Sequence, residues 1–345
     1  MRTLQSLSVI GGLAALAIVS GHAATEPEKP TMKAVIIHAY GGPEVLKLED
    51  VPRPEPKEDE ILIHVVAASI NPVDVAIRKG DLAELIGNKV PLIPGMDAAG
   101  LVEKTGAKIT KFKVGDPVYA FFTLDGEGGY AEFAAAKESE AAPKPKTVTC
   151  VQAAALPAAA STAWQVLVDT AKVSAGQTVL IHGGSGGVGH FAIQIAKARG
   201  AKVIATASTA NQDFLKQMGA DQAIDYTKTK FEDVAKDVDV VLDMVGGDTL
   251  KRSYGVVKKG GIVVSIVDEP DQAALDAHGI RGVTFRSTPK ASVLEDLRRL
   301  IDAKKITPVV SQVLPLSEAA KAQEQIATRH TRGKIVLLVT EETKE

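Results

Sequence analysis

Residues 178–200, TVLIHGGSGGVGHFAIQIAKARG, decide the fold of this chain. An apolar, β-branched run comes first, a cluster of glycines follows, and a helical pattern with Phe191 and Ile195 on its apolar side comes last. A strand that ends in a glycine-rich turn and continues as a helix is the sequence pattern of a dinucleotide-binding crossover. The alternative is an ordinary strand-to-helix turn, because glycine-rich turns are common.

The residues of this turn have distinct expected roles. We expect Gly184 to take the tight turn, Gly186 to let the backbone approach a pyrophosphate, and Gly189 to let the helix pack closely against the strand. Gly187 and Val188 lie at the start of the helix, where free N–H groups and the helix dipole favour phosphate. All five residues are therefore candidates for cofactor binding.

The composition is that of an ordinary globular protein. The chain has 345 residues, of which 45% are hydrophobic and 24% are charged, and its formal net charge is −2. This length accommodates about two domains. No basic stripe is present and the net charge is near zero, so we expect no nucleic-acid partner. The single cysteine, Cys150, excludes an intrachain disulfide and a cysteine-based structural zinc site.

The N-terminal segment has the composition of a leader. Arg2 precedes an apolar run within residues 4–20, and small residues around Ala23 follow. This pattern predicts a secretory signal peptide over residues 1–24, followed by a polar linker over residues 25–31. An uncleaved membrane anchor is the alternative, although the run is shorter than the ~20 residues of a spanning helix. The segment therefore predicts an exported, periplasmic protein or one tethered to a membrane.

The rest of the chain divides into three parts. Residues 32–155 contain short β-rich runs interrupted by glycine and proline, which is typical of a mostly antiparallel barrel. Residues 156–286 alternate apolar strands with helical patterns, which indicates a parallel sheet covered on both faces. Residues 287–345 add helices and strands that most simply return to the first unit. The expected fold class is α/β, with a discontinuous barrel domain and a doubly wound Rossmann domain.

Ten short motifs occur in a specific order along the chain. They are MKAV and GGPEVL within residues 32–46, AASINPVDVAIRKG at 67–80, PGMDAAG at 94–100, GGYAEFAA at 128–135, AAALPAAASTAW at 153–164, HGGSGGVG at 182–189, GAD.AIDY at 219–226, DMVGG at 243–247 and GKIVL at 333–337. Together they resemble the zinc-independent quinone oxidoreductase branch of the medium-chain dehydrogenase/reductase superfamily. The resemblance implies a GroES-like catalytic domain in two chain segments around a Rossmann domain, and a homodimer.

The same resemblance bears on metal binding. Zinc-dependent members of the superfamily carry a cysteine and a histidine at the positions that Asn71 and Met96 occupy here. Neither an amide nor a thioether is a usual ligand of Zn²⁺. We therefore expect no metal site.

The end of the second strand of the Rossmann pattern bears on the choice of cofactor. NAD enzymes place a carboxylate there to hold the ribose 2′-hydroxyl, whereas this strand ends at Ser208. By resemblance, Tyr226 donates its phenol to a 2′-phosphate, and Lys216 or Lys228 could supply charge. The basic residue usual in the family just after the strand is missing, since residues 209–211 are Thr-Ala-Asn. NADP(H) is favoured over NAD(H), and the alternative role of Ser208 is to cap the next helix.

Four positions are expected to lie near the nicotinamide. By resemblance, Thr162 lies beside the ring. After the fourth strand, Val245, Gly246 and Gly247 would let backbone groups approach the carboxamide. With no metal and no evident nucleophile, the protein has to orient the cofactor against an electron-poor acceptor.

The substrate side of the site is expected at Asn71 and Asp74. By resemblance, Asn71 donates a hydrogen bond to a carbonyl oxygen of the substrate, and Asp74 is a polar contact or an orienting partner. The alternative is that residues 71–74 simply form a turn. No tyrosine lies in residues 81–94, where related enoyl reductases carry a proton donor, so a proton would come from water.

Three functions fit these features. The first is an NADPH-dependent reductase of small quinones or α,β-unsaturated carbonyl compounds. The second is a metal-free alcohol dehydrogenase, which lacks an evident acid–base group. The third is a cofactor-binding sensor or structural protein of the same fold without turnover, which the lack of an evident catalytic side chain permits.

Overall fold

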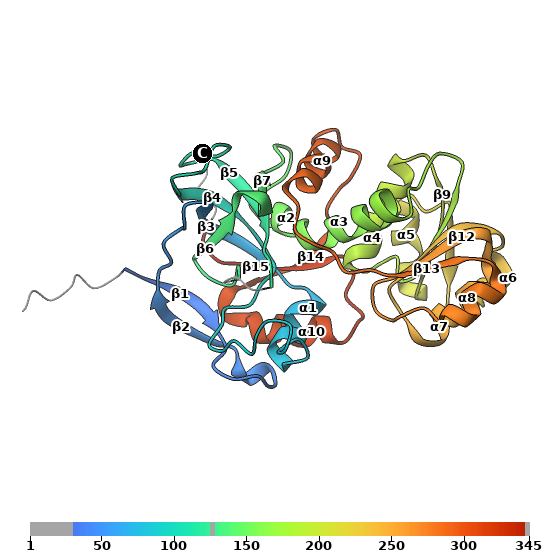
Figure 1. Ribbon diagram of the computed structural model, residues 1–345, viewed down its shortest axis with the longest axis horizontal. Coiled ribbons are helices and arrows are strands. Elements are labelled where there is room, and N and C mark those ends of the chain that lie inside the picture. Colours follow the sequence, from blue (N-terminus) through green and yellow to red (C-terminus); the bar gives the residue numbers. More distant parts are fainter. Residues whose placement is uncertain (1–29, 125–127, 342–345) are drawn as a thin grey trace, which may run out of the picture.

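The computed structural model describes residues 30–124 and 128–341. A strand-rich unit and an α/β unit lie next to each other, with helices α2, α3 and α9 between the two sheets (Figure 1). The predicted leader, residues 1–24, lies outside the described residues. The predicted α/β class is confirmed.

The α/β unit is built on a parallel sheet of six strands. Its strands are β8 (Thr178–Ile181), β9 (Lys202–Ala207), β10 (Gln222–Asp225), β11 (Val238–Asp243), β12 (Val257–Ser265) and β13 (Arg281–Thr284). Their spatial order is β10-β9-β8-β11-β12-β13. In chain order this is 3-2-1-4-5-6, the Rossmann arrangement, and the order reverses between β8 and β11. A crevice for a dinucleotide is expected at the carboxyl ends of these two strands.

Both faces of this sheet are covered, as the apolar strands predicted. Val179 and Ile181 pack with α3 and α4, whereas Leu180, between them, packs with residues of α6, α7 and α8. Successive side chains of a strand point to opposite faces, so a strand buried on both sides is apolar throughout. The α-helices of the described residues are α1 (Pro72–Lys79), α2 (Cys150–Ala154), α3 (Pro157–Trp164), α4 (Gly187–Ala198), α5 (Gln212–Gln217), α6 (Phe231–Val234), α7 (Gly247–Ser253), α8 (Gln272–His278), α9 (Ala291–Asp302) and α10 (Ala319–Ala327).

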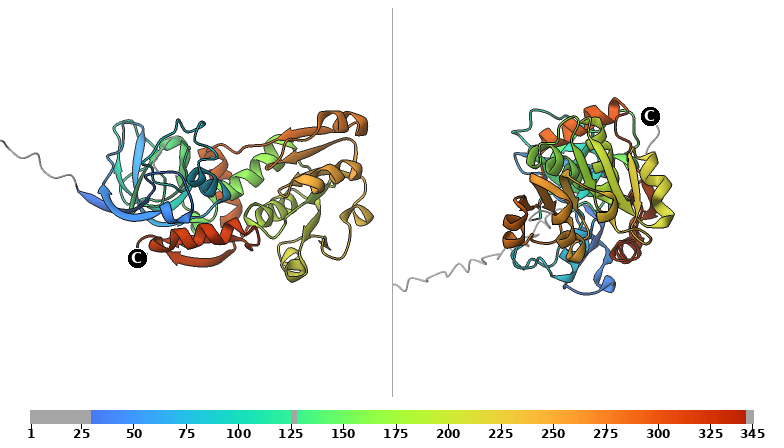
Figure 2. Two further views of the ribbon diagram at one scale, coloured as in Figure 1. Left: turned by 90° about the horizontal axis from the view of Figure 1, so that it is seen from below. Right: turned by 90° about the vertical axis from the view of Figure 1, so that its right-hand side faces the viewer.

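The strand-rich unit contains a sheet of seven strands and a two-stranded ribbon. The ribbon pairs β1 (Thr31–Ile36) with β2 (Lys47–Pro52). The larger sheet contains β3 (Glu60–Ser69), β4 (Asp97–Thr105), β5 (Pro117–Phe121), β6 (Phe133–Lys137), β7 (Ala141–Pro143), β14 (Val310–Pro315) and β15 (Lys334–Leu338). The last strand, β15, pairs antiparallel with β3, so the chain returns to its first unit after the Rossmann sheet. The left view of Figure 2 shows the red C-terminal segment against this unit.

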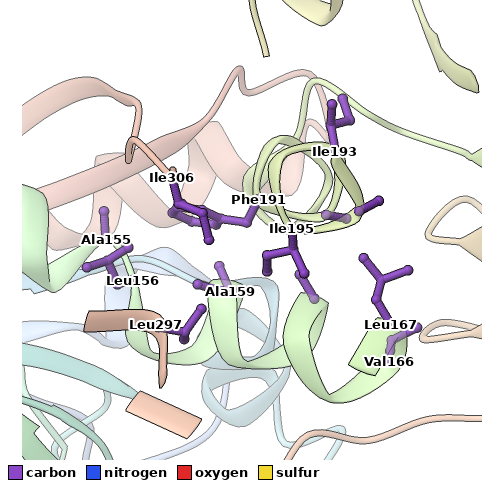
Figure 3. Close-up of a cluster of buried hydrophobic side chains, with 14 of the residues drawn as sticks. Ala155, Leu156, Ala159, Val166, Leu167, Phe191, Ile193, Ile195, Leu297 and Ile306 are labelled. Carbon is purple, nitrogen blue, oxygen red and sulfur yellow. The ribbon is translucent and has the colours of Figure 1, made fainter. Parts of the chain in front are cut away.

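A single apolar cluster crosses from one unit to the other. It joins Val66 and Tyr119 of the first unit, the alanines of α2 and α3, and Phe191 of α4. Figure 3 shows side chains from α3, α4 and α9 meeting in this cluster, among them Ala159, Phe191 and Leu297. The small alanine side chains let α3 approach both sheets closely, and the two units are therefore held together by a continuous core.

The glycine turn differs in one detail from the expectation. Gly183 takes the left-handed conformation with φ +75°, whereas Gly184 has no positive φ. Gly184 is needed for space instead, since a Cβ there would lie 3.0 Å from the Cβ of Ala205. Gly189 has the predicted role, because a Cβ there would lie 2.3 Å from the carbonyl oxygen of Gly183. Strand β8 and helix α4 therefore approach each other more closely than a side chain allows.

We predict that Gly189→Ala lowers the free energy of unfolding by about 1–3 kcal/mol, because the added methyl group overlaps the backbone of residues 183 and 184. Gly255→Ala is the matched control, since no atom lies within 4 Å of a Cβ at that position. Urea unfolding monitored by circular dichroism measures both variants. Equal stability of the two variants would contradict the close packing of α4 on the turn.

Candidate functional site

A buried polar cluster lies where β3 ends and α1 begins. Asn71 is the N-cap of α1, and its side-chain amide is held from two sides. The amide nitrogen donates to Asp97 Oδ2 at 2.9 Å, and the amide oxygen accepts from Lys334 Nζ at 2.5 Å. Only 5% of Asn71 is exposed. The amide orientation is therefore fixed by an anion on one side and a cation on the other.

The anion and the cation of this cluster are themselves fully engaged with the protein. Asp97 also accepts from Ser69 Oγ at 2.5 Å and from the Ala158 N–H at 2.7 Å. Lys334 donates to the Ile70 carbonyl at 2.9 Å and lies 3.7 Å from Asp97. Burial lowers the pKa of Lys334, and the nearby carboxylate of Asp97 opposes this shift. The cluster joins the start of β15 to the end of β3 and the start of β4.

Asp74 lies behind Asn71 and does not face a substrate cleft as expected. Its carboxylate is completely buried and accepts from the N–H groups of Asn71 at 2.7 Å and Met96 at 3.2 Å, and from Tyr130 Oη at 3.0 Å. Burial raises the pKa of Asp74 to about 7, against the lowering effect of the Asn71 N–H. Of the two expected roles, the geometry favours that of an orienting partner over that of a polar contact to substrate.

The glycine turn lies beside this cluster. The Gly333 N–H donates to the Ser185 carbonyl at 2.9 Å, so the residues before β15 are attached to the turn. A Cβ at Gly187 would lie 3.1 Å from Lys334 Cδ, so the helix start is next to the lysine stem. The first N–H groups of α4, at Gly187, Val188 and Gly189, have no acceptor one turn earlier within the helix and can bind an anion.

The carboxyl end of β9 carries the residues expected at a 2′-phosphate. Ser208 is half-buried, its hydroxyl accepts from Asn211 Nδ2 at 3.2 Å, and Tyr226 is exposed, with its N–H bonded to the carbonyl of Ala207. Lys216 lies in the last turn of α5 and pairs with Asp213 at 3.5 Å. The structure brings Arg332 to this turn instead.

The loop after β11 has its N–H groups already engaged. The N–H groups of Val245 and Gly246 donate to Asp243, and the N–H of Gly247 donates to Asp268 at 2.7 Å. The carbonyl oxygens are therefore the backbone groups that this loop can offer to a carboxamide.

Thr162 lies on α3 and is 8% exposed. Its hydroxyl contacts the Ala158 carbonyl at 2.7 Å and Ser287 Oγ at 2.9 Å. These contacts tie α3 to the segment that follows the Rossmann sheet.

Sequence reasoning missed three charged residues of this region: Asp97, Lys334 and Arg332. A signal existed for Lys334, since a lysine at the start of the apolar strand KIVLL is unusual unless it is paired. Asp97 gave a weaker signal, as a carboxylate at the start of an apolar strand. Arg332 gave none, because its partners lie about 120 residues earlier in the chain.

Among residues 30–124 and 128–341, no three His, Cys, Asp or Glu side chains are placed to hold a metal ion. Asn71 and Met96 share the carboxylate of Asp74 through their backbone N–H groups. The amide of Asn71 is occupied by Asp97 and Lys334. The absence of a metal site stays a prediction based on these residue types.

Two family models match the chain. The model described as "Alcohol dehydrogenase GroES-like domain" matches residues 57–146, and the model described as "Zinc-binding dehydrogenase" matches residues 218–337. The first covers strands of the barrel unit, and the second runs from the Rossmann sheet into β15.

Characterised relatives match almost the whole described chain. An NADPH-dependent alkenal/one oxidoreductase of Arabidopsis thaliana is 41% identical over 317 residues, which cover 89% of this chain and 79% of the relative. A quinone oxidoreductase of Sus scrofa is 36% identical and covers 89% and 98%. The solved structure of a quinone oxidoreductase from Coxiella burnetii has a TM-score of 0.84 at 36% identity, over 90% of this chain and all of that one.

The expectation of an exported or membrane-tethered protein is wrong. Four curated relatives are named for the chloroplast or the mitochondrion. In the described part of the chain, no helix has the length and apolar character needed to cross a bilayer. One arginine before a short apolar run has the composition of a leader, but composition alone does not determine the compartment to which a protein is delivered. The segment itself, residues 1–24, lies outside the described residues.

We predict that Asp74 makes the protein less stable as the pH rises. Its pKa in the folded chain is about 7, above the ordinary value of 3.8, so the folded state holds the proton more tightly. The contribution of Asp74 to the free energy of unfolding is fully present below pH ~4 and is lost as the pH rises through ~7. The free energy of unfolding then falls by at most about 1.4 kcal/mol per pH unit.

The free energies of unfolding of the wild type and of Asp74→Asn are measured from pH 4 to pH 8. The difference between the two curves gives the contribution of the Asp74 carboxyl group. We expect the wild type to lose stability relative to the variant as the pH rises. Parallel curves for the two proteins would show that Asp74 does not titrate in this range.

Proposed function

The chain belongs to the quinone oxidoreductase branch of the medium-chain dehydrogenase/reductase superfamily, and on this premise we propose that it reduces small quinones or α,β-unsaturated carbonyl compounds with NADPH. The observation that carries the proposal is the position of the Asn71 cluster beside the glycine turn, tied to it through Gly333 and Lys334. A hydrogen-bond donor for a carbonyl oxygen thus lies next to a dinucleotide site. NADPH, when bound, supplies the hydride from its nicotinamide ring.

Residues at the carboxyl ends of three strands fit the parts of the cofactor. The N–H groups of Gly187, Val188 and Gly189 suit the pyrophosphate, with Gly184 and Gly186 leaving room for it. Ser208 and Tyr226 suit the adenosine end of the cofactor. At the nicotinamide end, the hydroxyl of Thr162 and the carbonyl oxygens of Val245, Gly246 and Gly247 are the groups proposed to orient the ring.

Asn71 is the residue proposed to act on the substrate. One N–H of its amide donates to Asp97, which leaves the second N–H for a carbonyl oxygen. That oxygen gains negative charge as hydride arrives, and a preorientated donor stabilises this charge. Asp74 contributes by holding the backbone of Asn71, and Lys334 by holding the amide oxygen. No side chain of the cluster is proposed as an acid, so the proton comes from water.

A homodimer is also part of the proposal. In the described part of the chain, β13 is one of the two outer strands of the Rossmann sheet, with residues Arg281 and Thr284 exposed at its ends. An uncovered edge strand offers unpaired backbone groups to a second copy of the chain.

We predict that the purified protein oxidises NADPH when an acceptor is added. Loss of NADPH absorbance with 1,2-benzoquinone and with a 2-alkenal measures this, and kcat/KM should be higher for NADPH than for NADH. Prior treatment with a strong metal chelator should leave the rate unchanged, because Asn71 and Met96 are not zinc ligands. Tight binding of NADPH without acceptor-dependent oxidation would favour the sensor instead.

We predict that Asn71→Ala lowers kcat/KM for the acceptor about 10²-fold, because a donor to the developing oxyanion is lost. The dissociation constant of NADPH should change little, since Asn71 contacts Asp97 and Lys334 and not the glycine turn. Equilibrium binding of NADPH and the melting temperature are the controls for folding. A wild-type kcat/KM in a folded variant would remove Asn71 from the mechanism.

A further inference from the structure

The turn after β9 is contacted by a guanidinium from the other unit. Arg332, two residues before β15, donates from Nε to Asn211 Oδ1 at 2.8 Å and from Nη2 to the Ala210 carbonyl at 3.0 Å. Its guanidinium carbon lies 5.3 Å from the centre of the Phe214 ring, on its face. Asn211 in turn donates to Ser208 Oγ at 3.2 Å. Arg332 is thus held beside the residue expected at the cofactor's ribose.

Arg332 has unused hydrogen-bonding capacity. A guanidinium has five N–H donors, and the two bonds to the turn use two of them. The side chain is exposed, and within residues 30–124 and 128–341 no carboxylate lies within ion-pair distance of it. The positive charge at this turn is therefore uncompensated.

The neighbouring cations are already paired. Lys216 pairs with Asp213 at 3.5 Å, and Lys228 pairs with Asp225 at 3.5 Å. The carboxylate of Asp225 also contacts this turn, since the hydroxyls of Thr209 and Thr227 donate to it. The hydroxyls keep Asp225 ionised, and the ammonium of Lys228 offsets part of its charge, so its repulsion of a nearby phosphate is reduced.

We propose that Arg332 is the residue that makes this protein select NADPH over NADH, by binding the 2′-phosphate at the turn after β9. This inference rests on the proposed function, since it assigns the cation for the cofactor named there. In a Rossmann unit the ribose 2′ position lies at the end of the second strand, and an arginine nearby accommodates a 2′-phosphate. A guanidinium binds phosphate through two parallel hydrogen bonds. The cation comes from the catalytic unit and not from the turn itself.

This assignment has a structural consequence. Gly333 donates to Ser185 in the glycine turn, and Lys334 donates to Asn71, so three successive residues contact three parts of the site. A phosphate held by Arg332 would therefore fasten the cofactor to both units at once. NADH lacks this phosphate and would be held by the Rossmann unit, including its glycine turn, without the contact to Arg332.

The test compares equilibrium binding to Arg332→Gln, Arg332→Lys and wild type. The ligands are NADPH, NADH, 2′,5′-ADP and 5′-ADP, and titration calorimetry gives the dissociation constants without turnover. Arg299→Gln is the matched control, because it removes the same charge from an exposed arginine that pairs within α9. Far-UV circular dichroism and the melting temperature verify folding of each variant.

We expect Arg332→Gln to weaken NADPH and 2′,5′-ADP binding about 10–100-fold, the value of charged hydrogen bonds, and to change NADH and 5′-ADP binding less than about twofold. Arg332→Lys should restore part of the loss, because it keeps the charge without the planar fork. The preference for 2′,5′-ADP should weaken as salt is raised in the wild type and not in Arg332→Gln.

Two results would overturn the inference, and they differ from each other. If the wild type prefers 2′-phosphorylated ligands and Arg332→Gln keeps the full preference, the cofactor assignment stands and Arg332 is not its cause. If the wild type shows no preference for 2′-phosphorylated ligands, the NADPH half of the proposed function fails together with the inference.

Discussion

The buried ammonium of Lys334 is the interaction on which the site depends. It lies at the start of β15, 2% exposed, and bonds to Asn71 and to the Ile70 carbonyl, with Asp97 at 3.7 Å. An unpaired charge in such a place would be very costly, and removing one partner of a buried pair typically costs about 3–5 kcal/mol. The ammonium is therefore stable only while β3, β4 and β15 keep their places. The last strand of the chain thereby fixes the amide of Asn71.

The orientation of the Asn71 loop is held by a carboxylate in a way that does not need a metal. Asp74 accepts from the backbone N–H groups of both Asn71 and Met96, the two positions at which zinc-dependent members of the superfamily carry ligands. These bonds come from backbone N–H groups. They therefore hold the segments of Asn71 and Met96 together independently of which side chains these two positions carry. The loop can thus keep its geometry while the side chain of Asn71 bonds to Asp97 and Lys334. Asp74 was expected as a polar contact to substrate or as an orienting partner, and its burial favours the second role.

The sequence predicts the fold better than it predicts the site. Continuous apolar runs and a glycine turn are local signals, so the parallel sheet and the close packing at Gly189 followed from residues near each other in the chain. The tight turn fell one residue earlier than expected, at Gly183, because several glycines in a row satisfy the same pattern. Lys216 was expected to supply charge near Ser208, and in the structure it pairs with Asp213 within α5. Arg332 reaches that place from the far end of the chain, and no local pattern reveals it.

Long-range contacts of this kind also explain why the two units act as one site. The glycine turn belongs to the Rossmann unit, whereas Asn71 belongs to the barrel, and the bond from Gly333 to Ser185 joins them directly. The apolar core that both units share at α3 and α4 holds the two units in fixed relative positions, because a close-packed interior resists displacement of one unit against the other. Hydride transfer needs its two partners about 3–3.5 Å apart and correctly aligned. A chain without an evident catalytic acid has to achieve reduction by such alignment, so the rigidity of the contact between its units is itself part of the chemistry.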